Sequence, residues 1–220
     1  MRLTSGRIRQ SRSDAAASVS LFLLFFIALG NATGAGEISS TPADADAHAR
    51  HHVTLTHATR SVVQYAIPDL KLVREDGKPS SLGEAVGQGE PVVIDFIYTT
   101  CTTICPLASQ TFSQLQQMMG DDAKRVRFVS ISIDPEQDTP RRLADYAQKF
   151  GAGPQWHMYT GTVQASLAVQ RAFDVYRGDK MSHTPVTLVR TTPDKPWVRF
   201  DGFATADELL GELRPQVAVK

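Results

Sequence analysis

The two cysteines of this chain, Cys101 and Cys105, are the residues whose type and spacing most clearly suggest chemistry. They lie four residues apart in residues 99–106, directly after an apolar run that is typical of a buried strand. If this segment is helical, positions i and i+4 share a face, with Cβ atoms roughly 5–6 Å apart. Such a separation is compatible with a disulfide and also with two thiolates that bind one metal ion.

A structural role explains this cysteine pair poorly. In the chain-entropy model, closing so short a loop stabilises a fold by only roughly 2 kcal/mol, against ~4.7 kcal/mol for a loop of about a hundred residues. Two buried free thiols that act as small hydrophobes are a second structural alternative. The threonine-rich surroundings of the pair are not typical of a core segment. Metal binding or thiol redox chemistry is therefore the favoured interpretation.

A third ligand would complete a metal site. Two thiolates favour copper(I) or zinc, and a tetrahedral structural zinc site needs two further ligands that no second cysteine pair supplies. One imidazole would give a trigonal copper(I) site, and His183 is the best candidate because it lies in a predicted turn before a core strand. The alternative for His183 is a surface residue that hydrogen-bonds to the backbone. His157 follows Trp156 before a predicted strand, and we interpret it mainly as a packing residue.

Charged groups are scarce near the cysteines in the sequence. Residues 96–120 contain no Asp, Glu, Lys or Arg, so a lowered thiol pKa requires a helix N-terminus, a bound metal or charges distant in sequence. Three acidic residues follow the next predicted strand: Asp134, Glu136 and Asp138. Helix capping and loop solvation are their favoured roles, and the alternative is that they come near the cysteine site. Four other histidines are interpreted as solvated, with auxiliary metal capture as the alternative: His48, His51, His52 and His57.

The N-terminus has the layout of a secretory signal. Four arginines precede an apolar run at residues 19–29, and small residues follow it. The run is shorter than the ~20 residues of a usual spanning helix, although alanines 15–17 could extend it. Residues 1–35 are therefore predicted to be a signal peptide or an N-terminal membrane anchor, and the chain to be exported to the periplasm, with or without attachment to the inner membrane. In an oxidising compartment the two cysteines can close into a disulfide.

The composition is that of an ordinary globular protein. The 220 residues are 42% apolar, and the formal net charge is zero. Without residues 1–35 the chain keeps 19 basic and 22 acidic residues, so nothing indicates nucleic-acid binding. Residues 36–60 have little apolar periodicity and are predicted to form a flexible, His-containing linker. One domain is predicted at residues 61–220.

Strands and helices are predicted to alternate along this domain. Apolar runs predict strands at residues 92–98, 126–133, 186–189 and 198–200, and a further strand enters an Asp-Gly turn at residues 73–78. Helices are expected after Cys105, with Pro106 in the first turn, from Thr139, after Thr162 and from Thr205. This order predicts an α/β fold with a central mixed β-sheet flanked by helices on both faces. The cysteines follow the first buried strand, at the end where open α/β sheets bind ligands.

Several segments of the chain resemble the Sco/SenC family of copper chaperones. They are Asp76-Gly77-Lys78, residues 91–93, the Cys101-x-x-x-Cys105-Pro106 motif, residues 132–140, residues 159–162 and His183. The resemblance extends over residues 62–215 and implies a thioredoxin-like fold. It also implies that Cys101, Cys105 and His183 bind one copper ion per monomer, as Cu(I) or Cu(II), and that the two cysteines are a redox-active pair.

The resemblance further implies a function. The family assists maturation of the binuclear copper site in cytochrome c oxidase, so the chain is expected to be a monomeric metallochaperone rather than an enzyme. The expected partners are a copper-containing subunit of a respiratory oxidase or reductase, other copper chaperones and thioredoxin-like reductants. The alternative function is a thiol-disulfide oxidoreductase that reduces the copper-ligand cysteines of a partner, and a third is a redox or copper sensor.

Two positions depart from the family pattern. Ser182 stands where an acidic residue commonly precedes the histidine, so a carboxylate that would orient the imidazole is missing there. Pro185 precedes the strand at residues 186–189, at a place where thioredoxins carry a cis-proline opposite their active cysteines. This proline gives added weight to thiol-disulfide chemistry.

Overall fold

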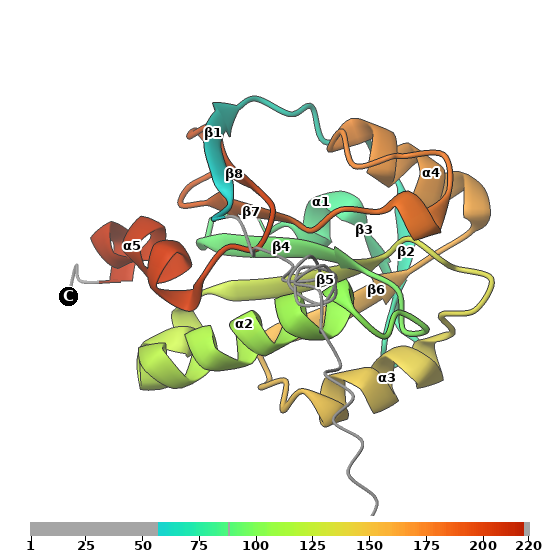
Figure 1. The fold of residues 1–220 in the computed structure, drawn as a ribbon, viewed down its shortest axis with the longest axis horizontal. Helices are drawn as coiled ribbons and strands as arrows, with labels where there is room; N and C mark the ends of the chain where they lie inside the picture. The colour runs from blue at the N-terminus through green and yellow to red at the C-terminus, as the bar shows by residue number, and fades with distance from the viewer. Residues whose placement is uncertain (1–56, 88, 218–220) are drawn as a thin grey trace, which may run out of the picture. The chain divides into compact units, whose positions relative to one another are not determined.

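A mixed β-sheet forms the centre of the fold (Figure 1). The computed structural model describes residues 57–87 and 89–217. The strands are β1 (Thr59–Val63), β2 (Lys71–Arg74), β3 (Pro79–Ser81), β4 (Val92–Ile97), β5 (Arg127–Ser132), β6 (Trp156–Thr160), β7 (Val186–Arg190) and β8 (Trp197–Asp201). Their order in the sheet is β1-β8-β7-β4-β5-β6-β2-β3. Strand β5 runs parallel to both β4 and β6, and the other neighbours are antiparallel.

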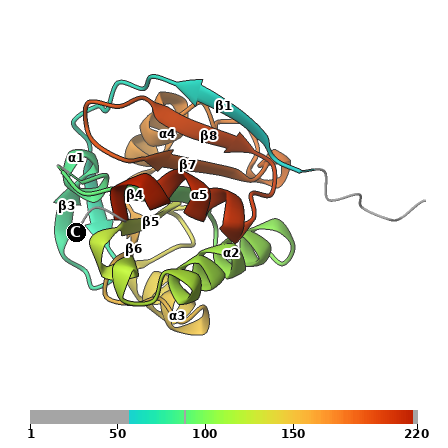
Figure 2. The same cartoon turned by 90° about the vertical axis from the view of Figure 1, so that its left-hand side faces the viewer.

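Helices cover both faces of this sheet. They are α1 (Leu82–Ala85), α2 (Ile104–Met119), α3 (Pro140–Lys149), α4 (Val163–Ala172) and α5 (Ala206–Val217), with short 3-10 turns η2 (Gly120–Arg125) and η3 (Lys180–Ser182). Helices α2 and α3 lie on one face and α4 on the other (Figure 1), and α5 lies beside α2 (Figure 2). The predicted α/β fold with a mixed sheet flanked by helices is confirmed.

The predicted helix starts are also confirmed. The Thr139 side chain accepts a hydrogen bond from the Arg142 amide and caps α3, which begins at Pro140. Thr162 caps α4 in the same way. Before α5, the Thr205 amide and hydroxyl donate to Glu208, whose own amide donates to the Thr205 hydroxyl. These side chains satisfy amide groups that no intrahelical carbonyl can reach.

Three features of the fold were not predicted in full. Strand β1 begins at Thr59, inside the predicted linker, and pairs with β8 along its whole length. It is an edge strand with three exposed residues, so it lacks the apolar run that marks a buried strand. His157 lies within β6 rather than before a strand, and the four-residue helix α1 is too short to show a helical period.

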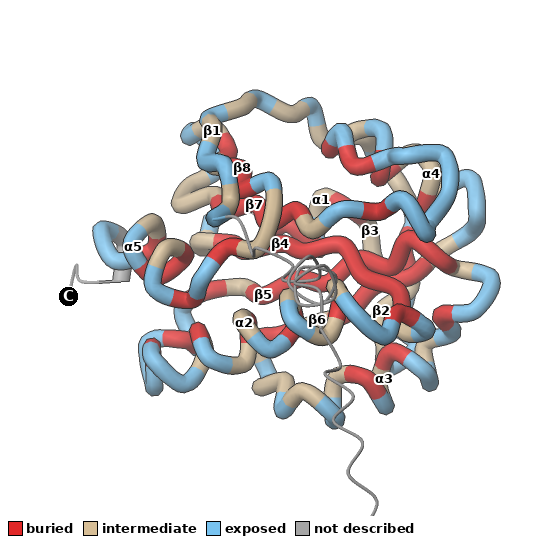
Figure 3. The backbone as a smooth tube through the Cα atoms, viewed as in Figure 1, coloured by how far each residue is buried: buried red, intermediate tan, exposed pale blue. Residues whose placement is uncertain are grey.

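The core is built on the central strand and on helix α2. All six residues of β4 are buried, and the buried stretches run through the middle of the sheet in Figure 3. Phe112 of α2 packs against Phe128 and Trp156, with ring centroids 5.7 Å and 5.5 Å away. This aromatic cluster fixes α2 on the sheet, and with it the residues at the start of α2.

The N-terminal predictions lie outside the described residues. These are the signal peptide or anchor at residues 1–35, nearly all of the linker, and His48, His51 and His52. Within residues 57–87 and 89–217, no helix has both the length and the hydrophobicity needed to cross a lipid bilayer.

Replacing Phe112 should test how strongly α2 is held. Phe112→Ala is expected to lower the free energy of unfolding by about 3–5 kcal/mol, because it leaves a cavity beside the rings of Phe128 and Trp156. Urea unfolding followed by circular dichroism measures the loss. Leu107→Ala, at an exposed position of the same helix, is the matched control and should change stability by less than about 1 kcal/mol. Equal losses in the two variants would contradict this account of the core.

Candidate metal and redox site

The two cysteines lie where β4 leads into α2. Both are buried and reduced, and Cys105 is the second residue of α2. The Cys105 amide donates to the Cys101 Sγ atom at 3.4 Å, and the Cys101 amide donates to the Tyr98 carbonyl at 3.1 Å. Thr103, at the N-cap position of α2, makes no capping hydrogen bond with its side chain. The Cys101 sulfur therefore receives the helix-terminal amide that a capping side chain would otherwise bind.

The two thiols differ in acidity. Burial opposes ionisation of Cys101, but hydrogen bonds from the Cys105 and Thr103 backbone and from the Tyr98 side chain outweigh it and lower the pKa of Cys101 to about 7. Burial raises the pKa of Cys105, and the charge of Cys101 raises it further. Near pH 7 Cys101 is therefore partly ionised to the thiolate, whereas Cys105 stays a protonated thiol. The sequence analysis expected a helix N-terminus as one source of such a shift.

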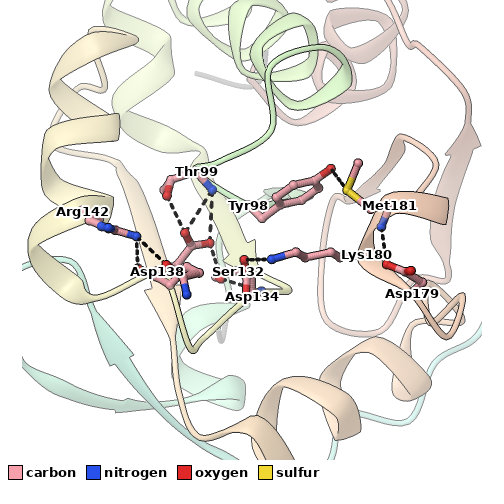
Figure 4. A network of polar contacts seen from close by, with 10 residues as sticks. Tyr98, Thr99, Ser132, Asp134, Asp138, Arg142, Asp179, Lys180 and Met181 are labelled. Atoms are coloured by element: carbon pink, nitrogen blue, oxygen red, sulfur yellow. Dashed lines mark hydrogen bonds and ion pairs between the residues drawn. The ribbon is translucent and has the colours of Figure 1, made fainter.

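A buried carboxylate fastens this turn to the sheet. Asp138 accepts hydrogen bonds from the Thr99 amide at 3.1 Å, from the Thr99 hydroxyl at 2.5 Å and from the Ser132 hydroxyl at 2.6 Å (Figure 4). It is wholly buried. The prediction that Asp138 is a solvated loop residue is therefore wrong. Sequence reasoning missed this role because the contact is long-range: Thr99 follows β4, whereas Asp138 follows the neighbouring strand β5.

A second buried carboxylate holds the segment that carries the predicted histidine. Asp134 is 6% exposed and binds the Lys180 ammonium at 2.5 Å (Figure 4). Lys180 begins η3, which ends one residue before His183. The predicted solvated role of Asp134 is also wrong, whereas Glu136 is exposed as expected.

His183 is buried, with 7% of its surface exposed, and its Nε2 atom lies 3.0 Å from the Phe96 carbonyl oxygen. Burial lowers the pKa of His183, so the ring is neutral near pH 7. A carbonyl only accepts, so Nε2 carries the proton and Nδ1 keeps a free lone pair. Within the described part of the chain, no three His, Cys, Asp or Glu side chains lie close enough to hold one metal ion. The structure thus places His183 near the end of β4 but does not group it with the two thiols.

The remaining histidines have other surroundings. His157 Nδ1 lies 2.9 Å from the Glu75 carboxylate, so a polar contact accompanies its packing in β6. His57 is exposed and forms an isolated bridge with Phe203. The peptide bond before Pro185 is trans, unlike the cis bond of thioredoxins.

Asp95 is a buried acid that sequence reasoning missed. It lies in the middle of β4 with 1% of its surface exposed, and neither carboxylate oxygen has a hydrogen-bond partner among the described residues. Burial raises the pKa of Asp95 to about 7, and the nearby Ser130 hydroxyl opposes only part of this shift. The negative charge of Asp95 also contributes to the raised pKa of Cys105. The one available signal was an acidic residue inside an apolar strand, six residues before Cys101.

Comparison with known proteins identifies the family. The family model SCO1/SenC matches residues 60–217. This chain belongs to the SCO1/SenC family. The SCO1 protein homolog of Bacillus subtilis (strain 168) is 32% identical over 106 residues, which cover 48% of this chain and 54% of that protein. This SCO1/SenC chain spans about half the length of the curated relatives that it matches first.

Solved structures of SCO1/SenC proteins have the same fold. Bradyrhizobium japonicum ScoI, solved with copper bound, has a TM-score of 0.57 at 25% identity, covering 69% of this chain and 99% of that one. BsSco, a member of the Sco family of cytochrome c oxidase assembly proteins in which a disulfide switch was identified, has a TM-score of 0.59 at 24% identity. That match covers 74% of this chain and 99% of BsSco. The expected thioredoxin-like fold is confirmed.

The unequal acidity of the thiols should be visible in alkylation. In the reduced, metal-free protein, iodoacetamide is expected to modify Cys101 first, at a rate that rises with pH to a plateau and is half-maximal near pH 7. Cys105 should react only at much higher pH, because burial raises its pKa. Mass spectrometry of peptides at a series of pH values measures both rates. Cys105→Ser should keep the fast reaction and Cys101→Ser should lose it, whereas equal rates at the two residues would contradict the assignment.

Asp95 should make stability depend on pH. Its folded-state pKa of about 7 lies above the ordinary value of 3.8, so between these values the folded protein keeps a proton that the unfolded chain releases. The free energy of unfolding should therefore fall as the pH rises through this window. Asp95→Asn should remove that dependence, and Asp145→Asn, at an exposed position, should preserve it. Urea unfolding at about pH 5 and about pH 8 compares the three proteins, and parallel behaviour of Asp95→Asn and the parent would refute the assignment.

Proposed function

We propose that this chain binds one copper ion through Cys101, Cys105 and His183 and matures the copper site of a respiratory enzyme such as cytochrome c oxidase. The observation that carries the proposal is the reduced cysteine pair in one turn, with one thiol partly ionised near neutral pH. Thiolates are ligands that copper(I) prefers over harder groups. Family membership supports the proposal, because ScoI of Bradyrhizobium japonicum was solved with copper bound.

The chemistry of His183 fits a third ligand. Its ring is neutral and keeps a lone pair on Nδ1, which is the form that binds metals. Because the described residues contain no preformed group of three ligands, we propose that the His183 side chain approaches the two thiols when copper binds. The Phe96 carbonyl would then hold the imidazole in the metal-free state.

A competition titration tests the three ligands. The reduced full chain should take up one equivalent of Cu(I) under anaerobic conditions from a competing chelator, and Cys101→Ser or Cys105→Ser should weaken binding by at least roughly 100-fold. His183→Ala should weaken it by roughly 10- to 100-fold, because one of three donors is lost. His157→Ala, a histidine bound to Glu75 instead, is the matched control and should bind like the parent. Full affinity in His183→Ala would remove His183 from the site.

A thiol-disulfide oxidoreductase is the second candidate, and the unequal acidity of the two thiols favours it. The Cys101 thiolate would attack a partner disulfide and form a mixed disulfide, and Cys105 would then lose its proton and displace the partner's thiolate. The chain would end with a Cys101–Cys105 disulfide, so a dithiol reductant would have to restore it. Weak copper binding that does not depend on His183 would favour this function.

The surface beside the cysteines suits a protein client. A groove next to the turn is lined by polar side chains, mostly threonines and glutamines, and by the apolar side chains of Ile104, Pro106, Leu107, Phe150 and Phe203. We propose that the copper-containing subunit of the client enzyme docks there, with the chain exported to the periplasm and attached to the membrane or free. Other copper chaperones and thioredoxin-like reductants are proposed to reach the same turn, and the chain to act as a monomer.

A further inference from the structure

An exposed methionine lies beside the cysteine turn. Met181 is 75% exposed and is the most exposed of the large hydrophobic residues that the structure describes. Methionine is a residue type that is usually buried. The proposed site of Cys101, Cys105 and His183 gives Met181 no role that would account for its exposed side chain. A thioether is a soft donor that binds Cu(I) and carries no charge.

The backbone of Met181 is anchored in spite of this exposure. The Asp179 carboxylate accepts a hydrogen bond from the Met181 amide at 2.9 Å, and the preceding Lys180 binds the buried Asp134 (Figure 4). Asp179 caps the short turn η3, and the Lys180–Asp134 ion pair joins η3 to the segment that follows β5. The thioether is therefore presented to solvent at a defined place on the surface.

Tyr98 connects this thioether to the cysteine turn. Its hydroxyl donates to the Met181 Sδ atom at 3.9 Å (Figure 4), and its backbone carbonyl accepts the Cys101 amide at 3.1 Å. One tyrosine of the cysteine turn thus contacts the exposed sulfur of Met181 and is hydrogen-bonded to Cys101, which is 7% exposed. The Lys180 ammonium lies 5.8 Å from the centre of the Tyr98 ring and helps to keep the ring in place.

We propose that Met181 is the entry ligand for Cu(I), which receives the ion at the surface and passes it to Cys101. This inference rests on the proposed copper-binding function. In each exchange one sulfur replaces another on the metal: the donor's ligand leaves as the thioether binds, and the Cys101 thiolate then displaces the thioether. Copper remains Cu(I) throughout, so the transfer needs no oxidant or reductant. A thioether binds Cu(II) poorly, so this entry would also select the reduced ion.

The rate of copper uptake tests the proposal. Cu(I) is supplied anaerobically as its bicinchoninate complex, and transfer to the reduced full chain is followed by stopped-flow absorbance. Met181→Leu should slow transfer by roughly tenfold while leaving the equilibrium affinity within about twofold of the parent, because an entry ligand changes the rate and not the final site. Met118→Leu, which alters an exposed methionine of α2, is the matched control and should transfer like the parent.

A spectroscopic measurement separates this inference from the proposed function. In protein labelled with 13C at the methionine methyl groups, Ag(I), a redox-inert substitute for Cu(I), should shift the Met181 resonance in a Cys101→Ser variant, where the ion cannot move on. The Met118 resonance should stay in place. An unchanged transfer rate in Met181→Leu, or an unmoved Met181 resonance, would overturn the entry role and leave the three-ligand site intact. A parent that takes up no Cu(I) would overturn both.

Discussion

The contact on which the site depends is the buried Asp138 carboxylate at the carboxyl end of the central strands. It accepts hydrogen bonds from Thr99 in the cysteine turn and from Ser132 at the end of β5. A buried carboxylate is costly unless donors surround it, so the turn and the strand are held together by the need to satisfy one acid. The same turn leads into α2, whose Cys105 amide hydrogen-bonds to the Cys101 sulfur. The loop between β5 and α3, which carries Asp138, therefore holds the turn that contains the more acidic thiol.

That loop serves both halves of the site. Asp138 holds the cysteine turn, and Asp134, four residues earlier, holds the segment that leads to His183. The two groups of proposed ligands are far apart in the chain, yet each is tied to the same short connection. The resemblance to the family in residues 132–140 thus has a physical explanation, because Asp134 and Asp138 hold the segments that carry the proposed ligands.

Much of the fold was predictable from local patterns, and much of the site was not. The apolar run of β4, the capping threonines and Pro140 each act within a few residues, so the sequence displays them directly. Strand β1 lacks an apolar run because it lies at an edge, and only its pairing with β8 identifies it. The roles of Asp95, Asp134 and Asp138 depend on contacts with distant segments. For Asp134 and Asp138, a loop position in the sequence predicted solvent exposure wrongly. The position of His183 before a predicted strand made it only the best candidate for a third ligand, and the resemblance to the family implied that it binds copper.

The two acids also differ in how they meet solvent. Asp138 is wholly buried, and its three donors are neutral groups inside the protein. The Lys180 side chain that binds Asp134 is 38% exposed, so dissolved ions can screen this pair, with a Debye length of about 8 Å at an ionic strength of 0.15 M. The Lys180–Asp134 ion pair that holds the histidine segment therefore weakens as the salt concentration rises, whereas the Asp138 hydrogen bonds that hold the cysteine turn do not. Ionic strength can act on one half of the site and leave the other unchanged.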